Sequence, residues 1–146
     1  MDLQELIARE QIRDVKARYC RLLDTKDWQG FAALFTEDAI LDVSHDTGAS
    51  PHRGRDAIVT AVRWAVDHAK SAHYVHSAEF HFHGPDAADV IWAMHDHMVW
   101  EAAHSPIPPA TGITGYGHYR EHYLRQDGTW RIASLTLTRT NVELQH

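Results

Sequence analysis

The amino-acid sequence predicts an α+β fold in which a curved, mainly antiparallel sheet wraps around a long N-terminal helix. Apolar residues recur at spacings of three and four up to about residue 70, and at every second position afterwards. Helices followed by a meander of long strands are typical of a fold whose helices cover one face of a bent sheet. Because the 146 residues contain no repeat, linker or low-complexity segment, we expect a single domain over residues 1–146.

Three helices are expected ahead of the long strands. Over residues 3–24, apolar side chains form one stripe and charged side chains the other side, with Lys16 at the edge of the charged side. Asp27 has the residue type and the position of an N-cap for a short helix over residues 28–35. A third amphipathic helix is expected over residues 56–70.

The remaining chain has the pattern of strands. A first strand is expected over residues 39–43, and a loop over residues 44–53. The turn sequence at residues 83–86 and the Asp-Gly hairpin signal at residues 126–129 mark two tight connections. Four long strands are expected at about residues 72–83, 87–101, 112–126 and 129–140.

Composition and charge exclude several classes of function. The net charge of −6 and the absence of a Lys/Arg block argue against nucleic acid or an anionic membrane as partner. The apolar runs are too short to span a bilayer, and the acidic, helical N-terminus is unlike a signal sequence, so we expect a cytoplasmic protein. Cys20 is the one cysteine, which leaves no internal disulfide, and we interpret it as a thiol in the core or on its flank.

Thirteen histidines are scattered through the chain. The pairs His81/His83 and His95/His97 each place two imidazoles on one face of a strand, a geometry that can bind a metal. No third ligand follows at a recognisable spacing. We therefore expect solvent-facing or interface histidines and no metal site.

Five phrases along the chain form an ordered set. They are Tyr19-Cys-Arg-Leu-Leu-Asp24 with the following Thr-Lys-Asp27-Trp28, Leu34-Phe35-Thr-Glu-Asp38-Ala39, Gly54-Arg-Asp-Ala-Ile58, Ala72-His73-Tyr-Val, and Gly117-His-Tyr119 through Gly128-Thr-Trp130-Arg-Ile132. In this order the chain resembles the SnoaL-like branch of the nuclear transport factor 2-like superfamily. The resemblance implies a cone-shaped sheet with a pocket at its open end. Because the superfamily contains both enzymes and proteins without catalysis, each site residue has to be judged separately.

The resemblance implies a catalytic pair. Asp24 and His73 match the Asp–His pair of dehydratase and dehydrochlorinase members, and Tyr19 matches a tyrosine whose hydroxyl donates to a substrate oxygen. A carboxylate that binds one imidazole nitrogen leaves the other nitrogen free to take a proton. Helix periodicity alone places Asp24 roughly 140° from Tyr19, toward solvent. The alternatives are an exposed carboxylate, a strand histidine that faces water or a backbone carbonyl, and a core tyrosine.

Further residues are candidates for the pocket. We expect Trp28, Trp92 and Met94 to form apolar walls that exclude water. Asp96 interrupts the apolar face of its strand and is either a second acid of the site or a residue at a bulge or strand rim. Arg139 is either a partner for a substrate carboxylate at the pocket mouth or a member of a surface ion pair.

The opposite face of the same strand predicts self-association. Ile91, Ala93 and Val99 make this outer face too apolar for bare solvent. Members of the superfamily often bury the convex face against a second subunit. We therefore expect a homodimer or homotrimer.

These observations lead to two hypotheses about function. The first is a cofactor-independent lyase, a dehydratase or related eliminating enzyme, or an isomerase, acting on a small cyclic or polycyclic apolar molecule with the Asp–His pair as general base. The second is a non-catalytic module of the same fold that binds a small molecule or serves in an assembly. A hydrogen bond between the side chains of Asp24 and His73 in an enclosed pocket would favour the enzyme.

Overall fold

A single six-stranded sheet and four helices make up the computed structural model, which describes all 146 residues. The helices are α1 (Leu3–Asp24), α2 (Trp28–Ala32), α3 (Ser44–Thr47) and α4 (Arg55–Val66), with a 3₁₀ turn η1 (Ala102–His104). The strands are β1 (Phe35–Asp42), β2 (His52–Arg53), β3 (Lys70–Phe82), β4 (Ala87–Val99), β5 (Gly112–Gln126) and β6 (Thr129–Gln145). The predicted α+β fold is confirmed.

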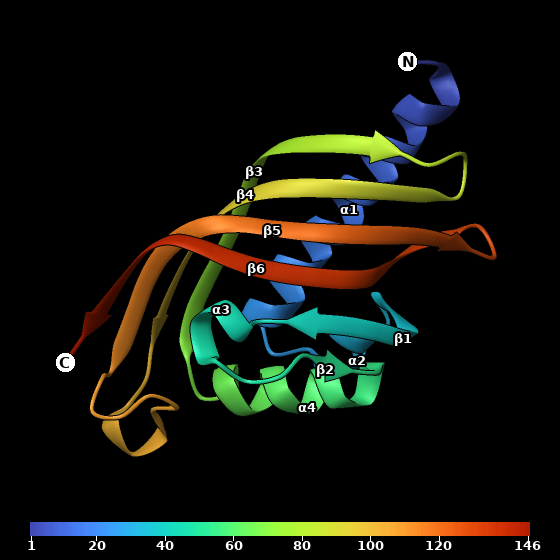
Figure 1. The fold of residues 1–146 in the computed structure, drawn as a ribbon. Helices are drawn as coiled ribbons and strands as arrows, with labels where there is room; N and C mark the ends of the chain where they lie inside the picture. Colours follow the sequence, from blue (N-terminus) through green and yellow to red (C-terminus); the bar gives the residue numbers. More distant parts are fainter.

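The sheet is curved and mainly antiparallel. Its strand order is β2-β1-β6-β5-β4-β3, and the pair of β1 and β6 is the one parallel pair. Figure 1 shows the long strands β3 to β6 bending across the molecule, with α1 running behind them. Register shifts in β3 and β6 mark bulges, which increase the local twist and bend of a strand.

Helix α1 begins and ends at defined caps. The side chain of Asp2 accepts a hydrogen bond from the backbone N–H of Glu5, and the backbone leaves the helix through Lys26, which has a φ of 62°. The predicted apolar stripe is buried, from Ala8 and Ile12 to Leu22. Lys16 was predicted at the edge of the charged side, and this is wrong. Its side chain is fully buried.

Several boundaries differ from the prediction because backbone pairing overrides the local pattern. The second helix ends at Ala32, since Leu34 accepts a hydrogen bond from Ile132 of β6 and the chain continues as β1. Helix α4 ends at Val66, and β3 starts at residue 70, where it pairs with the end of β4. The predicted loop over residues 44–53 contains α3 and the two-residue strand β2.

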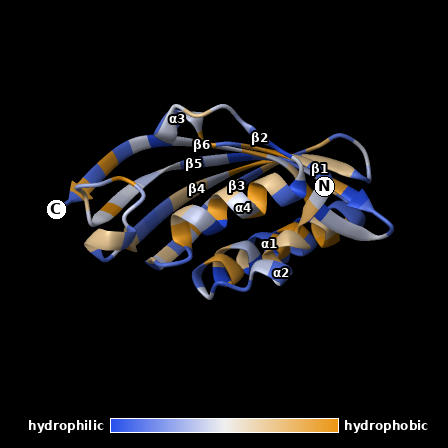
Figure 2. Cartoon of the chain, turned by 90° about the horizontal axis from the view of Figure 1, so that it is seen from below, coloured by the Kyte–Doolittle hydropathy of each residue, from blue (hydrophilic) through white to orange (hydrophobic).

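The core lies between the helices and the concave face of the sheet. Figure 2 shows α1, α2 and α4 on the same side of the sheet. Aromatic rings fill the contact, and Tyr19 packs against Phe31, Phe35 and Tyr119 with ring centroids 5.1–6.2 Å apart. The indole N–H of Trp28 donates to Asp67 just after α4, which ties α2 to α4. None of the helices is both long and apolar enough to cross a membrane.

Candidate active site

Asp24 and His73 meet where the end of α1 lies against the start of β3. Ring atom Nδ1 of His73 lies 2.6 Å from Oδ1 of Asp24, and the backbone N–H of His73 donates to Oδ2 at 2.8 Å. The hydroxyl of Ser71 donates to Oδ1 at 2.9 Å, and Lys26 donates to that hydroxyl. Both carboxylate oxygens are therefore fixed by β3, and the hydrogen bond between the two predicted residues is present.

The contact with β3 explains why Asp24 points inward. Helical rotation alone turns this side chain away from the stripe of Tyr19, but the first residues of β3 pack along the flank of the last helical turn. The side chain of Asp24 is 21% exposed and that of His73 6%. The flank of the helix is thus part of the interior at this end of α1.

The hydrogen bonds set the charge of Asp24 and the tautomer of His73. Partial burial acts to raise the pKa of Asp24, but the hydrogen bonds from His73 and Ser71 together outweigh it, and the pKa lies below its ordinary value. The carboxylate is therefore ionised at neutral pH and accepts from Nδ1–H. In this tautomer Nε2 of His73 carries a lone pair, as a general base requires.

Asp96 lies on the other side of the imidazole. It is the cross-strand neighbour of His73 in β4, and Oδ2 of Asp96 is 4.0 Å from Nε2 of His73. The register of β4 is continuous at this residue, so Asp96 faces inward as a regular strand residue and not at a bulge. Its side chain is 2% exposed.

Arg139 of β6 binds Asp96 with a two-pronged ion pair. Nη1 and Nη2 of Arg139 donate to the two oxygens of Asp96, each at 2.7 Å, and Nε donates to Asp46 of α3 at 2.6 Å. Burial acts to lower the pKa of Arg139, but the two carboxylates outweigh it and raise the pKa. The guanidinium is buried and permanently charged, and it pairs with two carboxylates of the protein, the buried Asp96 and Asp46 at the surface.

A glycine in β5 makes room for this guanidinium. Gly115 pairs with Asp96 across the strands, and a Cβ atom there would lie 2.7 Å from Nη1 of Arg139. The register of β5 and β6 shifts at Thr140, and Arg139 just before it is the last buried residue of β6. The concave face thus carries a polar row of His73, Asp96 and Arg139.

Tyr19 lies on the inward face of α1, as predicted, and is almost fully buried. Burial raises the pKa of its hydroxyl well above the ordinary value, so at neutral pH it is a hydrogen-bond donor and not a base. Burial likewise raises the pKa of the Cys20 thiol to about 11, which makes this cysteine a poor nucleophile.

A buried ion pair beside Tyr19 was not predicted from the sequence. Nζ of Lys16 lies 2.6 Å from Oε2 of Glu121, and the hydroxyl of Tyr123 donates to the other carboxylate oxygen at 2.7 Å. The ammonium also lies 3.6 Å and 3.8 Å from the ring centroids of Tyr19 and Tyr119. The interior of the cone therefore holds compensated charge as well as apolar side chains.

The predicted apolar wall residues are all buried. Trp92 and Met94 face the concave side of β4, and Trp28 belongs to the same core cluster. Trp28 packs on Phe31, with ring centroids 5.9 Å apart.

A pocket of about 510 Å³ lies on the other side of α1, between α1, α2 and the turn from β5 to β6, and it is not lined by Asp24 or His73.

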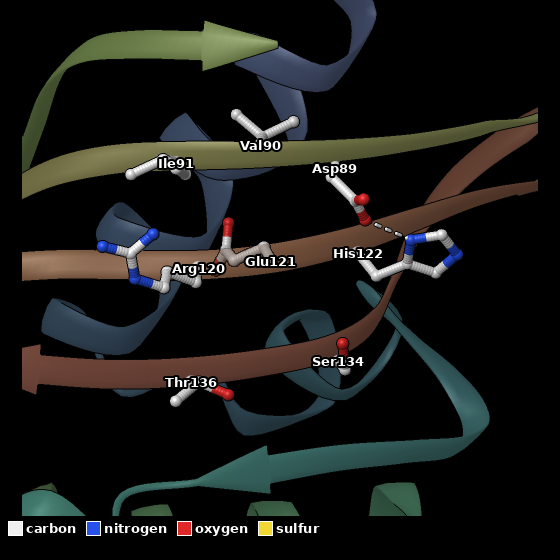
Figure 3. A pocket seen from close by; sticks show the side chains of 8 residues that line it. All are labelled: Asp89, Val90, Ile91, Arg120, Glu121, His122, Ser134 and Thr136. Atoms are coloured by element: carbon white, nitrogen blue, oxygen red, sulfur yellow. Dashed lines mark hydrogen bonds and ion pairs between the residues drawn. The ribbon is translucent and has the colours of Figure 1, made fainter. Parts of the chain in front are cut away.

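A second pocket, of about 340 Å³, lies over strands β4, β5 and β6 and has mostly outer-face residues (Figure 3). It is lined by Asp89, Val90, Ile91, Arg120, Glu121, His122, Ser134 and Thr136. Asp89 accepts hydrogen bonds from both His83 and His122 at 2.6 Å. His81, His83, His95 and His97 are exposed, and no three His, Cys, Asp or Glu side chains converge in a way that could hold a metal ion.

Comparisons with known proteins agree with this architecture. The family model of the SnoaL-like domain matches residues 4–136. A scytalone dehydratase-like protein from Novosphingobium aromaticivorans is similar in structure, with a TM-score of 0.85 and 20% identity over 100% of this chain and 93% of that one. A hexachlorocyclohexane dehydrochlorinase, LinA type 2, gives a TM-score of 0.84 and 17% identity over 100% and 94% of the two chains.

A third solved structure is more similar in sequence. This protein of unknown function from Mycobacterium tuberculosis is 26% identical, with a TM-score of 0.77 over 94% of this chain and 74% of that one. None of the curated proteins compared matches the chain. Since the family model covers most of the sequence, the resemblance is confirmed, and the chain belongs to the SnoaL-like family.

Proposed function

We propose that this protein is a cofactor-independent lyase that eliminates water or a similar small group from a neutral cyclic molecule, with His73 as general base. The observation that carries the proposal is the hydrogen bond between the side chains of Asp24 and His73. Asp24 binds Nδ1, which leaves the lone pair of Nε2 free on a side chain that is almost fully buried. A base positioned in this way contributes about 10²–10⁴-fold to a proton transfer.

The proposed reaction divides the work between three side chains. Nε2 of His73 takes a proton from a carbon next to the carbon that bears the leaving group. The electrons of the C–H bond form the new double bond as the leaving group departs with its own electron pair. Asp24 stabilises the imidazolium, and Tyr19, protonated at neutral pH, donates to the departing or enolising oxygen. His73 then returns the proton to the leaving group or to solvent.

The charges around the imidazole favour an uncharged substrate. Asp24, Asp96 and Asp46 carry three negative charges, against two positive charges, that of Arg139 and that of Lys26, which reaches Asp24 through Ser71. The Nε and both terminal nitrogens of Arg139 already donate to Asp46 and Asp96, so two protein carboxylates compensate its charge and it is not a free cation for a substrate carboxylate. We therefore propose a neutral, apolar, cyclic or polycyclic substrate, and the same machinery also serves an isomerisation through an enol.

Turnover of two compounds tests the proposal. The two structural relatives are named for scytalone dehydration and hexachlorocyclohexane dehydrochlorination, so scytalone and hexachlorocyclohexane are suitable probes. Elimination by the wild-type protein should fall by at least about 10²-fold in His73→Ala. His76→Ala is the matched control, because His76 lies on the same strand and is exposed. Equal loss in both variants would contradict the proposal.

A ligand that binds without reacting would point to the alternative. Thermal shift measurements with a panel of neutral polycyclic ketones and alcohols report binding independently of chemistry. Stabilisation by a compound that the protein returns unchanged, together with no turnover of either probe, would favour the non-catalytic binding module.

We also propose that the outer face of the sheet joins two or three copies of the chain. Ile91 and Ala93 are half-buried on this face, and Val99 is 40% exposed in the isolated chain. Tyr74 and Tyr116 add exposed aromatic area on neighbouring strands. Burial of such a contiguous patch against a second copy would remove it from water.

A further inference from the structure

The imidazole of His73 lies between two carboxylates at different distances. On the Nδ1 side, Asp24 is within hydrogen-bond distance at 2.6 Å, whereas on the Nε2 side Asp96 is 4.0 Å away. Hydrogen bonds of this type have lengths of about 2.7–3.2 Å, so a movement of about 1 Å would bring Asp96 into contact with Nε2. Asp96 is the direct cross-strand neighbour of His73, so the carboxylate and the imidazole stand side by side on the concave face.

Arg139 opposes this movement. It holds both oxygens of Asp96, and a forked contact of this kind fixes the direction of the carboxylate as well as its distance. The guanidinium is itself held by Asp46 through Nε and fits over Gly115, where a side chain would collide with it. The restraint on Asp96 therefore involves β4, β5, β6 and α3.

We propose that Arg139 is a positioning residue that keeps Nε2 of His73 free by holding the Asp96 carboxylate away from it. This inference rests on the proposed role of His73 as base. Without Arg139, Asp96 is an unpaired buried carboxylate beside an imidazole, and Nε2–H of the protonated ring is a charged donor within reach of it. His73 would then hold a proton on each nitrogen, bonded to Asp24 on one side and to Asp96 on the other, and would have no lone pair for a substrate.

The other charged groups near the ring do not replace Arg139. Lys26 reaches the site through Ser71 on the side of Asp24, and His45 of α3 accepts a hydrogen bond from the backbone N–H of Arg139. The remaining neighbours are the buried hydroxyls of Tyr19 and Tyr119, while Lys16 is paired with Glu121. Arg139 is thus the cation that compensates Asp96.

The protonation of Nε2 tests the proposal without any turnover. In protein labelled with ¹⁵N-histidine, the imidazole nitrogens of His73 are assigned by their loss in His73→Gln. At pH 7.5 we expect the signal of an unprotonated Nε2 in the wild type and that of a protonated Nε2 in Arg139→Met. The double variant Asp96→Leu/Arg139→Met removes both charges and should restore the unprotonated signal, which a merely structural role of Arg139 does not predict.

The result that overturns the proposal is an unprotonated Nε2 in Arg139→Met. If that variant does not fold, Arg139→Lys keeps the charge but not the fork, and it should give a partly protonated Nε2. An unprotonated Nε2 in that variant as well would also overturn the proposal. With a turned-over probe, Arg139→Met should lose at least about 10²-fold in kcat and the double variant should regain most of it. NMR signals as predicted with no turnover in the wild type would refute the lyase and leave the role of Arg139 intact.

Discussion

Replacing Lys16 with methionine should destabilise the protein strongly although the new side chain fits the same space. The side chains of Lys16 and Glu121 are both 0% exposed, and the ammonium is the cation that contacts this carboxylate. Without it, Glu121 keeps a single hydrogen bond, from Tyr123. Removal of one partner from a buried ion pair costs about 3–5 kcal/mol. Methionine retains the apolar contacts of the lysine stem, so little of this loss comes from a cavity.

The magnitude is large compared with the stability of a domain, which is typically about 5–15 kcal/mol. Urea unfolding followed by fluorescence of the five tryptophans should therefore show a much lower midpoint with an unchanged slope. Lys70→Met is the matched control, because Lys70 is exposed, and it should change the free energy of unfolding by less than about 0.5 kcal/mol. A loss below about 1 kcal/mol in Lys16→Met would refute the reasoning, which rests on an uncompensated buried charge.

The double variant Lys16→Met/Glu121→Gln separates charge from packing. Glutamine keeps an acceptor oxygen for Tyr123 and carries no charge. The double variant should therefore be more stable than Lys16→Met alone by at least about 1–2 kcal/mol. If both are equally unstable, lost contacts of the ammonium with the rings of Tyr19 and Tyr119 explain the effect better than the charge of Glu121 does.

Three further changes test other parts of the structure. The folded-state pKa of Asp24 is lowered, so the ionised carboxylate stabilises the fold above its unfolded pKa of about 4, and this contribution is lost as the pH falls through the folded pKa. The difference in the free energy of unfolding between wild type and Asp24→Asn, measured by urea unfolding, should therefore shrink as the pH falls below about 4. A pH-independent difference would contradict this. Gly115→Ala places a Cβ atom 2.7 Å from both Nη1 of Arg139 and the carbonyl oxygen of Asn141, so it should lower the melting temperature by several degrees. An unchanged melting temperature would contradict this and would show that the strands relax freely. Ala93→Arg should reduce the mass measured by light scattering to that of a monomer, and an unchanged oligomer, or a wild type that is itself monomeric at micromolar concentration, would exclude this face as the interface.

The main elements of the fold are predictable from the sequence because they depend on local periodicity. The spacing of apolar residues in α1 and the alternation in β4 each report which face is buried. The parallel pairing of β1 with β6 is different, since it joins residues about 100 positions apart and leaves no local signal. The second helix was predicted too long because Leu34 and Phe35 continue the helical spacing of apolar residues, while the backbone there pairs with β6.

The site is predictable where a family pattern exists and not where it depends on tertiary register. Asp24 lies on the flank of α1, and only the packing of β3 against that flank makes it half-buried. Lys16 finds its partner 105 residues later, so its burial has no local signal among charged neighbours. The pairing of Asp96 with Arg139 requires the register of three strands, although the inward alternation at Asp96 and the glycine at position 115 are traces of it in the sequence.

The central claim is that Asp24 and His73 act as one unit, and a double-mutant cycle in kcat tests it most directly. With either probe that the wild type eliminates, kcat is measured for Asp24→Asn, His73→Ala and the double variant, after circular dichroism has shown that each is folded. Each single variant should lose most of the activity, and the double variant should lose little more than the worse single, because Asp24 has no function without the imidazole that it orients. Near-normal turnover in His73→Ala, or losses that simply multiply in the double variant, would contradict the account.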